Sequence, residues 1–169
     1  MDMRIAGIVN DSITDGPGLR LSVFAQGCTH GCKGCHNPHT HAVDGGEVIS
    51  TESILEKAKN NPLLDGVTLT GGEPFLQADA MAEIARGAHQ MGLNVIAFTG
   101  FVWEDLIQCA DALRLLQHCD FVIDGKFDES LRSLDLEFKG SANQRLIDVK
   151  KSLSSGHTIV FENFEQARG

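Results

Sequence analysis

Three closely spaced cysteines are the residues of this chain best suited to chemistry. Cys28, Cys32 and Cys35 follow the pattern CxxxCxxC, which offers three thiolates to a bound metal centre. An iron–sulfur cluster held by four cysteines has every iron capped by protein, and such clusters transfer electrons. A cluster of four irons held by three cysteines keeps one iron open to a substrate or cofactor. The spacing therefore favours a catalytic 4Fe–4S cluster over an electron-transfer cluster.

Two other uses of these cysteines are alternatives. Zinc bound by three cysteines and one histidine is the first, because four histidines lie in or beside the same loop. They are His30, His36, His39 and His41. Zinc ligands usually occur in CxxC pairs, and the step from Cys28 to Cys32 is one residue longer, which suits a loop around a larger cluster. Disulfides are disfavoured, because the chain has five cysteines, an odd number, and we expect no secretory segment.

Length and composition indicate one domain. The chain has 169 residues and 42% hydrophobic content, which is enough for a core, and we expect a single domain over residues 1–169. Its first residues lack the apolar region of a signal peptide, and no apolar stretch approaches the length of a membrane span. We therefore expect a cytoplasmic protein without a membrane partner. A net charge of −9 argues against sequence-independent binding of nucleic acid.

Stretches typical of strands and helices alternate along the chain. Strands are expected at residues 19–25, 66–70, 93–98, 121–123, 146–149 and 158–161. Helices are expected after Ser50 or Thr51 and over 77–91, and an apolar stripe over 103–113 predicts another. Repeated βα units imply an α/β fold with a parallel sheet. A complete eight-unit barrel needs about 250 residues, so this length predicts a partial, laterally open (β/α) barrel of about five to six parallel strands.

The unusual residues all follow predicted strands. The cysteine loop follows the first main strand, Gly71-Gly72-Glu73-Pro74 the second, Thr99-Gly100 the third and Asp124-Gly125-Lys126 the fourth. Catalytic residues of parallel α/β folds lie at the C-terminal ends of the strands. Paired glycines there let a ligand approach the backbone, and Glu73 is a candidate acceptor for the ammonium group of a ligand. An open flank of the barrel would admit a large, even macromolecular, substrate.

CxxxCxxC and Gly-Gly-Glu-Pro together resemble the radical S-adenosylmethionine superfamily. Within it, Asp15-Gly16-Pro17-Gly18-Leu19-Arg20 resembles a segment of glycyl-radical-enzyme activases, and Gly34-Cys35-His36-Asn37-Pro38 resembles the end of their cysteine loop. Residues 124–127 and 140–145 are similar to the anaerobic ribonucleoside-triphosphate reductase activating proteins. The chain departs from the likeness at Gly34, where the wider superfamily has an aromatic residue, and at Glu73, where the reductase activases often have Asp.

The resemblance implies two cofactors and a reaction. Cys28, Cys32 and Cys35 would hold a 4Fe–4S cluster whose open iron binds S-adenosyl-L-methionine, and reduced flavodoxin or ferredoxin would donate the electron. Reductive cleavage would give methionine and a 5′-deoxyadenosyl radical, which removes hydrogen from a glycine of anaerobic ribonucleoside-triphosphate reductase. The residues implied to contact the cofactor are Gly34, Cys35, His36, Gly71, Gly72, Glu73, Pro74, Asp124 and Lys126, the last two at its methionine end.

Other functions stay open on the sequence alone. A pyruvate formate-lyase-like enzyme is an alternative protein substrate, and a small-molecule radical synthase is an alternative enzyme. A zinc module or an electron-transfer iron–sulfur module would be non-catalytic. Outside the motifs, Cys109 and Cys119 are expected to be small core residues and Trp103 a packing residue. His36 fits either a contact with the cofactor or a solvated loop.

Overall fold

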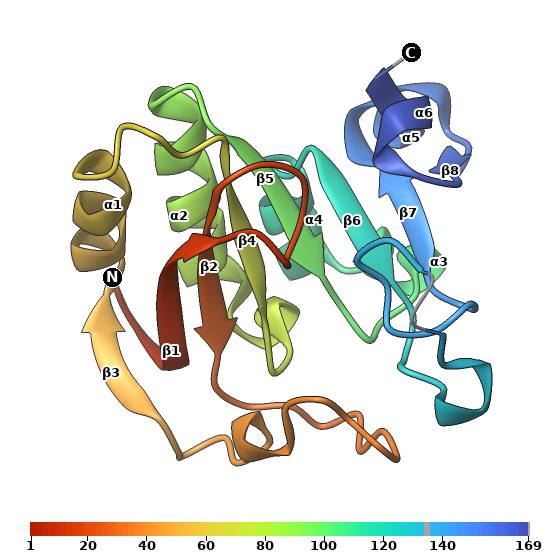
Figure 1. Ribbon diagram of the computed structural model, residues 1–169, viewed down its shortest axis with the longest axis horizontal. Helices are drawn as coiled ribbons and strands as arrows, with labels where there is room; N and C mark the ends of the chain where they lie inside the picture. Colours follow the sequence, from red (N-terminus) through yellow and green to blue (C-terminus); the bar gives the residue numbers. More distant parts are fainter. Residues whose placement is uncertain (134–135, 169) are drawn as a thin grey trace.

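The computed structural model describes residues 1–133 and 136–168, which form an eight-stranded mixed sheet with helices (Figure 1). Across the sheet the strands follow the order β3-β1-β2-β4-β5-β6-β7-β8. Their bounds are β1 Asp2–Ser12, β2 Arg20–Ala25, β3 Glu47–Ser50, β4 Gly66–Gly71, β5 Asn94–Phe98, β6 Phe121–Asp124, β7 Arg145–Asp148 and β8 Val160–Phe161. Neighbours among β2, β4, β5 and β6 are parallel, and the remaining pairs are antiparallel.

Helices and short 3-10 turns connect these strands. Their bounds are α1 Thr51–Lys59, α2 Ala78–Gln90, α3 Trp103–Leu106, α4 Ala110–Leu116, α5 Val149–Ser155 and α6 Phe164–Arg168, with η1 Pro38–Thr40, η2 Pro74–Gln77 and η3 Glu129–Leu131. Within the described ranges, no helix combines the length and the apolar character that crossing a membrane requires. The predicted α/β alternation is confirmed.

The predicted start of α1 is confirmed, but the single helix expected over residues 103–113 is not. Ser50 is the N-cap of α1, and its side chain accepts a hydrogen bond from the Ser53 N–H. The apolar stripe over 103–113 is split into α3 and α4, because Cys109 has an extended backbone at the start of α4. Cys109, expected to be a small core residue, is exposed, so that prediction is wrong, whereas Cys119 and Trp103 are buried in the core as expected.

The two faces of the sheet are covered differently. Helices α1, α2 and α4 lie against one face (Figure 1), and Val67 and Leu69 of β4 join the main hydrophobic core on that side. Side chains alternate between the faces of a strand. Thr68 and Thr70 therefore point to the opposite face, where Thr68 is hydrogen-bonded to Arg20 and Thr70 lines a cavity. That face also carries the smaller hydrophobic cluster, in which Ile96 of β5 and Ile123 of β6 pack with Phe164 of α6.

The number of parallel strands differs from the sequence prediction. Four described strands run parallel, fewer than the five to six expected. A parallel connection needs a crossover of a dozen or more residues, usually helical. Between β6 and β7 the described chain contains only the short turn η3, and β7 returns antiparallel to β6. At the other edge, β1 and β3 are antiparallel strands that the sequence analysis did not predict.

Arg20 fastens the turn before β2 to the sheet. Its side chain is fully buried, and Nη1 donates to the Pro17 carbonyl at 3.0 Å. Nε donates to Thr68 Oγ1 at 2.7 Å, and Nη2 donates to the Val67 carbonyl at 3.0 Å and to Asn94 Oδ1 at 2.7 Å. Burial lowers the pKa of Arg20 to about 10, so the guanidinium stays protonated at neutral pH. One cation thus joins residues of the turn, β4 and β5.

Replacing this guanidinium should destabilise the fold. Lysine cannot reproduce the planar set of donors, so Arg20→Lys should lower the free energy of unfolding by about 2–3 kcal/mol, because hydrogen bonds to charged groups contribute roughly 1.5–3 kcal/mol each. Arg114, half-exposed in its ion pair with Asp79, is the control, and Arg114→Lys should change stability by less than about 1 kcal/mol. Urea unfolding measures both. Equal losses would show that Arg20 has no special structural role.

Candidate active site

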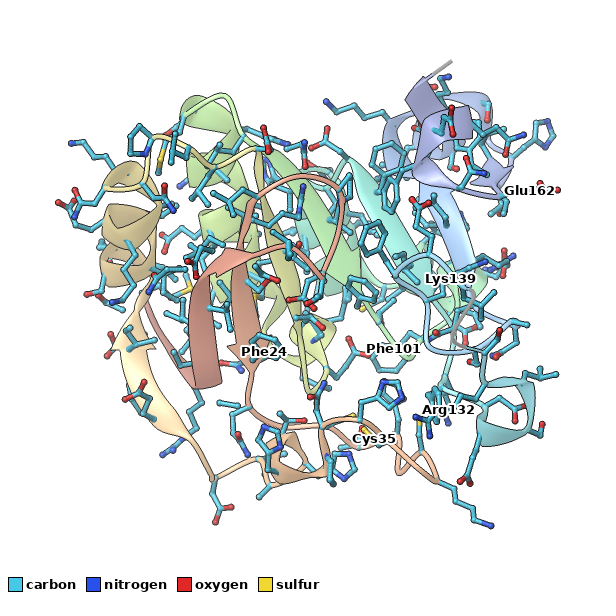
Figure 2. The ribbon with its side chains drawn as sticks, in the orientation of Figure 1. Phe24, Cys35, Phe101, Arg132, Lys139 and Glu162 are labelled. Carbon is cyan, nitrogen blue, oxygen red and sulfur yellow. The ribbon has the colours of Figure 1, made fainter. Side chains whose placement is uncertain are left out.

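A cavity of about 660 Å³ lies on the side of the sheet opposite α1, α2 and α4, at the C-terminal ends of the parallel strands. Its wall includes the cysteine loop on one side and the chain at residues 11–15 on the other. Phe24, Thr70 and Phe98 contribute from β2, β4 and β5. Figure 2 shows Cys35 in the loop beneath the strand ends, near Phe24 and Phe101. The predicted location of the site, at these strand ends, is therefore where the structure has its cavity.

The three cysteines of the CxxxCxxC pattern all line this cavity. Each is partly buried and none forms a disulfide. Cys35 Sγ accepts a hydrogen bond from the Asn37 N–H at 3.4 Å and lies 3.4 Å from His41 Nε2. Burial raises the pKa of the Cys28 thiol, and the negative charge of Glu73 adds to the rise. Within the described ranges, no group of three or more His, Cys, Asp or Glu side chains is arranged so that it could hold a metal ion.

Gly71 and Gly72 also line the cavity, and they approach the protein's own backbone closely. A Cβ at Gly72 would lie 2.4 Å from the Gly27 carbonyl oxygen. A Cβ at Gly71, where φ is +97°, would lie 2.5 Å from the Ala25 nitrogen. The Gly72 N–H donates to the Ala25 carbonyl and the Glu73 N–H to the Gly27 carbonyl, both at 2.8 Å. The two glycines therefore make room for the chain that leads into the cysteine loop.

The Glu73 side chain points into the protein and does not line the cavity. Its carboxylate is fully buried and hydrogen-bonded on both oxygens. The donors are His30 Nε2 at 2.6 Å, the Gly100 N–H and Thr99 Oγ1 at 2.8 Å, and the Phe75 N–H at 3.0 Å. The expected contact between this side chain and a ligand ammonium is therefore not available. Pro74 is likewise buried, at the start of η2, outside the cavity wall.

Asp124 and Lys126 do not line the cavity either. Ile123 packs in the smaller hydrophobic cluster with Phe164, so Asp124, one residue later, points to the other face of β6. There it accepts hydrogen bonds from the Trp103 N–H at 2.7 Å and from Arg145 Nη2 at 2.6 Å. Lys126 is exposed and lines a separate hollow outside the cysteine loop. Of residues 124–126, Gly125 alone lines the cavity, and the side chains of Asp124 and Lys126 lie outside its wall.

Of the two predicted cofactor contacts on either side of Cys35, one lines the cavity and the other does not. His36 lines the cavity, and its ring packs against Phe127 with centroids 4.8 Å apart. Gly34 does not line the cavity, and its φ of +73° serves the turn between the last two cysteines. Gln144 lines the cavity as well, while its neighbour Arg145 is held by Asp124.

Sequence reasoning missed two contributions to the site. His30 was considered as a ligand only in the zinc alternative, yet its side chain is only 6% exposed and hydrogen-bonded to Glu73. Asp15, named only as the first residue of the segment that resembles the activases, lines the cavity and accepts hydrogen bonds from Ser12 Oγ at 2.6 Å and Ser22 Oγ at 2.9 Å. For His30 the available signal was its place between two cysteines.

Comparison with known proteins now identifies the family. The family model of a 4Fe-4S single cluster domain matches residues 14–147. The anaerobic ribonucleoside-triphosphate reductase-activating protein of Enterobacteria phage T4 is 34% identical over 139 residues, which cover 78% of this chain and 85% of that protein. The chain belongs to this family of iron–sulfur activating proteins. The resemblance found in the sequence is thereby confirmed.

Other members and neighbours extend the comparison. The anaerobic ribonucleoside-triphosphate reductase-activating protein of Vibrio cholerae is 31% identical to this chain over 140 residues, which cover 78% of this chain and 89% of that protein. The pyruvate formate-lyase-activating enzyme of Clostridium pasteurianum is 32% identical, covering 78% of this chain but 63% of that enzyme. Among solved structures, QueE from Escherichia coli has a TM-score of 0.47 at 18% identity over 59% of this chain and 53% of its own, a likeness too small to define a shared fold.

A methyl group at Gly72 should disturb the cysteine loop. Gly72→Ala would press its Cβ against the Gly27 carbonyl, so we expect a loss of about 1–3 kcal/mol in the free energy of unfolding, typical of overpacking. Amide hydrogen exchange should also rise in the cysteine loop. Gly7→Ala is the matched control, because nothing lies within 4 Å of a Cβ there. An unchanged cysteine loop in Gly72→Ala would contradict the close packing described above.

Proposed function

We propose that this chain is a radical S-adenosylmethionine activating enzyme that generates a glycyl radical on anaerobic ribonucleoside-triphosphate reductase. One observation carries the proposal: three unpaired cysteines with CxxxCxxC spacing line a single cavity of about 660 Å³, in a member of a 4Fe–4S activating-protein family. When bound and reduced, the cluster supplies the electron that cleaves S-adenosyl-L-methionine into methionine and a 5′-deoxyadenosyl radical.

We assign Cys28, Cys32 and Cys35 as the ligands of the 4Fe–4S cluster, with one iron left open. The donor set fits the group, because soft thiolates are the ligands that iron–sulfur clusters take. The cavity also falls in the range of about 300–1,000 Å³ that is usual for ligand pockets. Spacing and a shared cavity wall support the assignment.

The cofactor contacts follow from the cavity wall. We propose that Gly71, Gly72, Cys35 and His36 bind S-adenosyl-L-methionine mainly through their backbone groups, with the His36 ring beside Phe127 at one end. Gly34, which lies outside the cavity wall, is proposed on the resemblance alone. Glycines suit this role because the absence of a Cβ lets a ligand approach the main chain. Glu73, Pro74, Asp124 and Lys126 are not part of the proposed contact set, since their side chains lie outside the cavity wall.

The architecture suits a macromolecular substrate. We propose that β2, β4, β5 and β6 form the centre of a partial, laterally open barrel within one domain over residues 1–169. Support comes from the packing of α1, α2 and α4 against one face, since the cavity lies on the opposite face. A glycine-bearing segment of the reductase would enter from that open face. Reduced flavodoxin or ferredoxin is the proposed electron donor, because reductive cleavage needs a low-potential electron.

A pyruvate formate-lyase-like enzyme is the second candidate for the protein substrate. The observation that favours it is the 32% identity to the activating enzyme of Clostridium pasteurianum, although this chain covers only 63% of that enzyme. Incubating the reduced, cluster-loaded protein with each candidate substrate enzyme decides between them. Electron paramagnetic resonance should detect a glycine radical on the reductase and none on the lyase, and the reverse pattern would support the second candidate.

Loss of one cluster ligand should abolish the chemistry. After anaerobic reconstitution with iron and sulfide, dithionite and S-adenosyl-L-methionine should yield methionine and 5′-deoxyadenosine, and Cys32→Ala should yield neither above background. Cys109→Ala is the control, because that cysteine is exposed at the start of α4 and should leave product formation unchanged. One tightly bound zinc per chain with no products would overturn the proposed function in favour of a structural metal module.

A further inference from the structure

Glu73 joins the cysteine loop to the ends of two strands. It follows β4 directly, and its own N–H donates to the Gly27 carbonyl at 2.8 Å, next to Cys28. Its carboxylate accepts from His30 on the other side of Cys28 at 2.6 Å. Glu73 therefore contacts the chain on both sides of Cys28, through the Gly27 carbonyl on one side and the His30 side chain on the other.

Residues 99–101, which directly follow β5, pack around the His30 ring. Thr99 and Gly100 bind the same carboxylate oxygen as His30, at 2.8 Å each. A Cβ at Gly100 would lie only 2.5 Å from His30 Cδ2, so a glycine is needed to make room for the ring. Phe101, beside the cysteine loop in Figure 2, packs edge-on against the ring at a centroid distance of 4.6 Å. The imidazole is thus bound and enclosed by residues 99–101.

No acceptor position of Glu73 is left for a ligand. An ionised carboxylate offers about four lone-pair positions. The Thr99 hydroxyl lies within hydrogen-bond distance of both oxygens, so Oε2 can take the Phe75 N–H and Thr99 while Oε1 takes the Gly100 N–H and His30 Nε2. Because the carboxylate only accepts, the His30 hydrogen lies on Nε2. The side chain has no exposed surface through which an ammonium could reach it.

We propose that Glu73 is a positioning residue, which sets the place of Cys28 and Cys32 through its hydrogen bond to His30 and does not contact the methionine ammonium. The inference deepens the proposed function, on which its cluster-dependent part rests. The chain between Cys28 and Cys32 contains His30, so fixing the imidazole fixes the connection between two of the proposed cluster ligands. Losing the bond should loosen this connection without removing a ligand.

The first test needs no cofactor. In the wild-type protein and in His30→Ala, amide hydrogen exchange is measured over residues 28–36, and the variant should exchange about tenfold faster, as expected for loss of one buried hydrogen bond. His39→Ala is the matched control, because this exposed histidine of the same loop has no described side-chain partner. His30→Gln keeps a donor at the same distance along the side chain and should restore most of the protection.

The second test separates positioning from ligand binding. The midpoint potential and the electron paramagnetic resonance spectrum of the loaded cluster should change alike in His30→Ala and Glu73→Gln, and the double variant should be no worse than the worse single variant. A Glu73→Gln effect that is confined to S-adenosyl-L-methionine affinity, and adds to that of His30→Ala, would overturn the inference. So would equal exchange in His30→Ala and His39→Ala.

The outcomes for this inference and for the proposed function are distinguishable. If the wild-type protein cleaves no S-adenosyl-L-methionine but His30→Ala still loosens the cysteine loop, the proposed function fails and the role of Glu73 in holding the loop stands. If the wild-type protein is active and His30→Ala matches His39→Ala in exchange and cluster spectrum, the positioning role is wrong and the proposed function stands.

Discussion

A carboxylate without any exposed surface has to find hydrogen-bond donors inside the protein, because a charged group removed from water is costly to leave unpaired. Glu73 finds them on the cysteine loop, on the end of β5 and on the turn that follows its own strand. These segments are distant in the sequence, and the carboxylate can be satisfied only when all of them are in place. The geometry of the cysteine loop is therefore coupled to the correct assembly of the parallel strands.

The alternation of side chains along the strands explains why the main hydrophobic core and the cavity lie on opposite faces of the sheet. Val67 and Leu69 pack with α1, α2 and α4 on one face, while Thr68 and Thr70 point to the opposite face. Burying the apolar face stabilises the sheet by roughly 25 cal/mol per Å² of apolar surface removed from water. The opposite face carries the cavity and the smaller hydrophobic cluster that includes Phe164 of α6. Arg20 and its buried acceptors tie the turn before β2 to this face at the far ends of the strands.

Much of the site could be predicted from the sequence because the motifs follow strands. Cys28 follows β2 closely and Gly71 ends β4, and parallel strands bring their C-terminal ends to one edge. The directions of Glu73 and Asp124 could not be predicted in the same way. Each depends on distant partners, His30 for the first and Arg145 for the second. A motif fixes which residue stands at a strand end, but the packing of the neighbouring segments decides which way its side chain points.

The strands that sequence reasoning missed have a related explanation. β1 and β3 pair antiparallel at one edge, and β7 turns back at the other, so none of them belongs to a strand–helix–strand unit. β1 is partly exposed along its length and contains Gly7, which weakens an alternating apolar pattern. Their pairing is set by register with neighbouring strands, which local sequence does not reveal. The parallel centre that holds the site was, by contrast, the predictable part.

The central claim is that three cysteines hold a four-iron cluster with one iron left for the cofactor. Mössbauer spectroscopy of protein reconstituted with ⁵⁷Fe, before and after addition of S-adenosyl-L-methionine, tests it most directly. The account predicts that one iron site of the cluster changes its isomer shift on binding while the others keep theirs. A spectrum in which no iron site responds, or in which the irons form no cubane cluster, would contradict it.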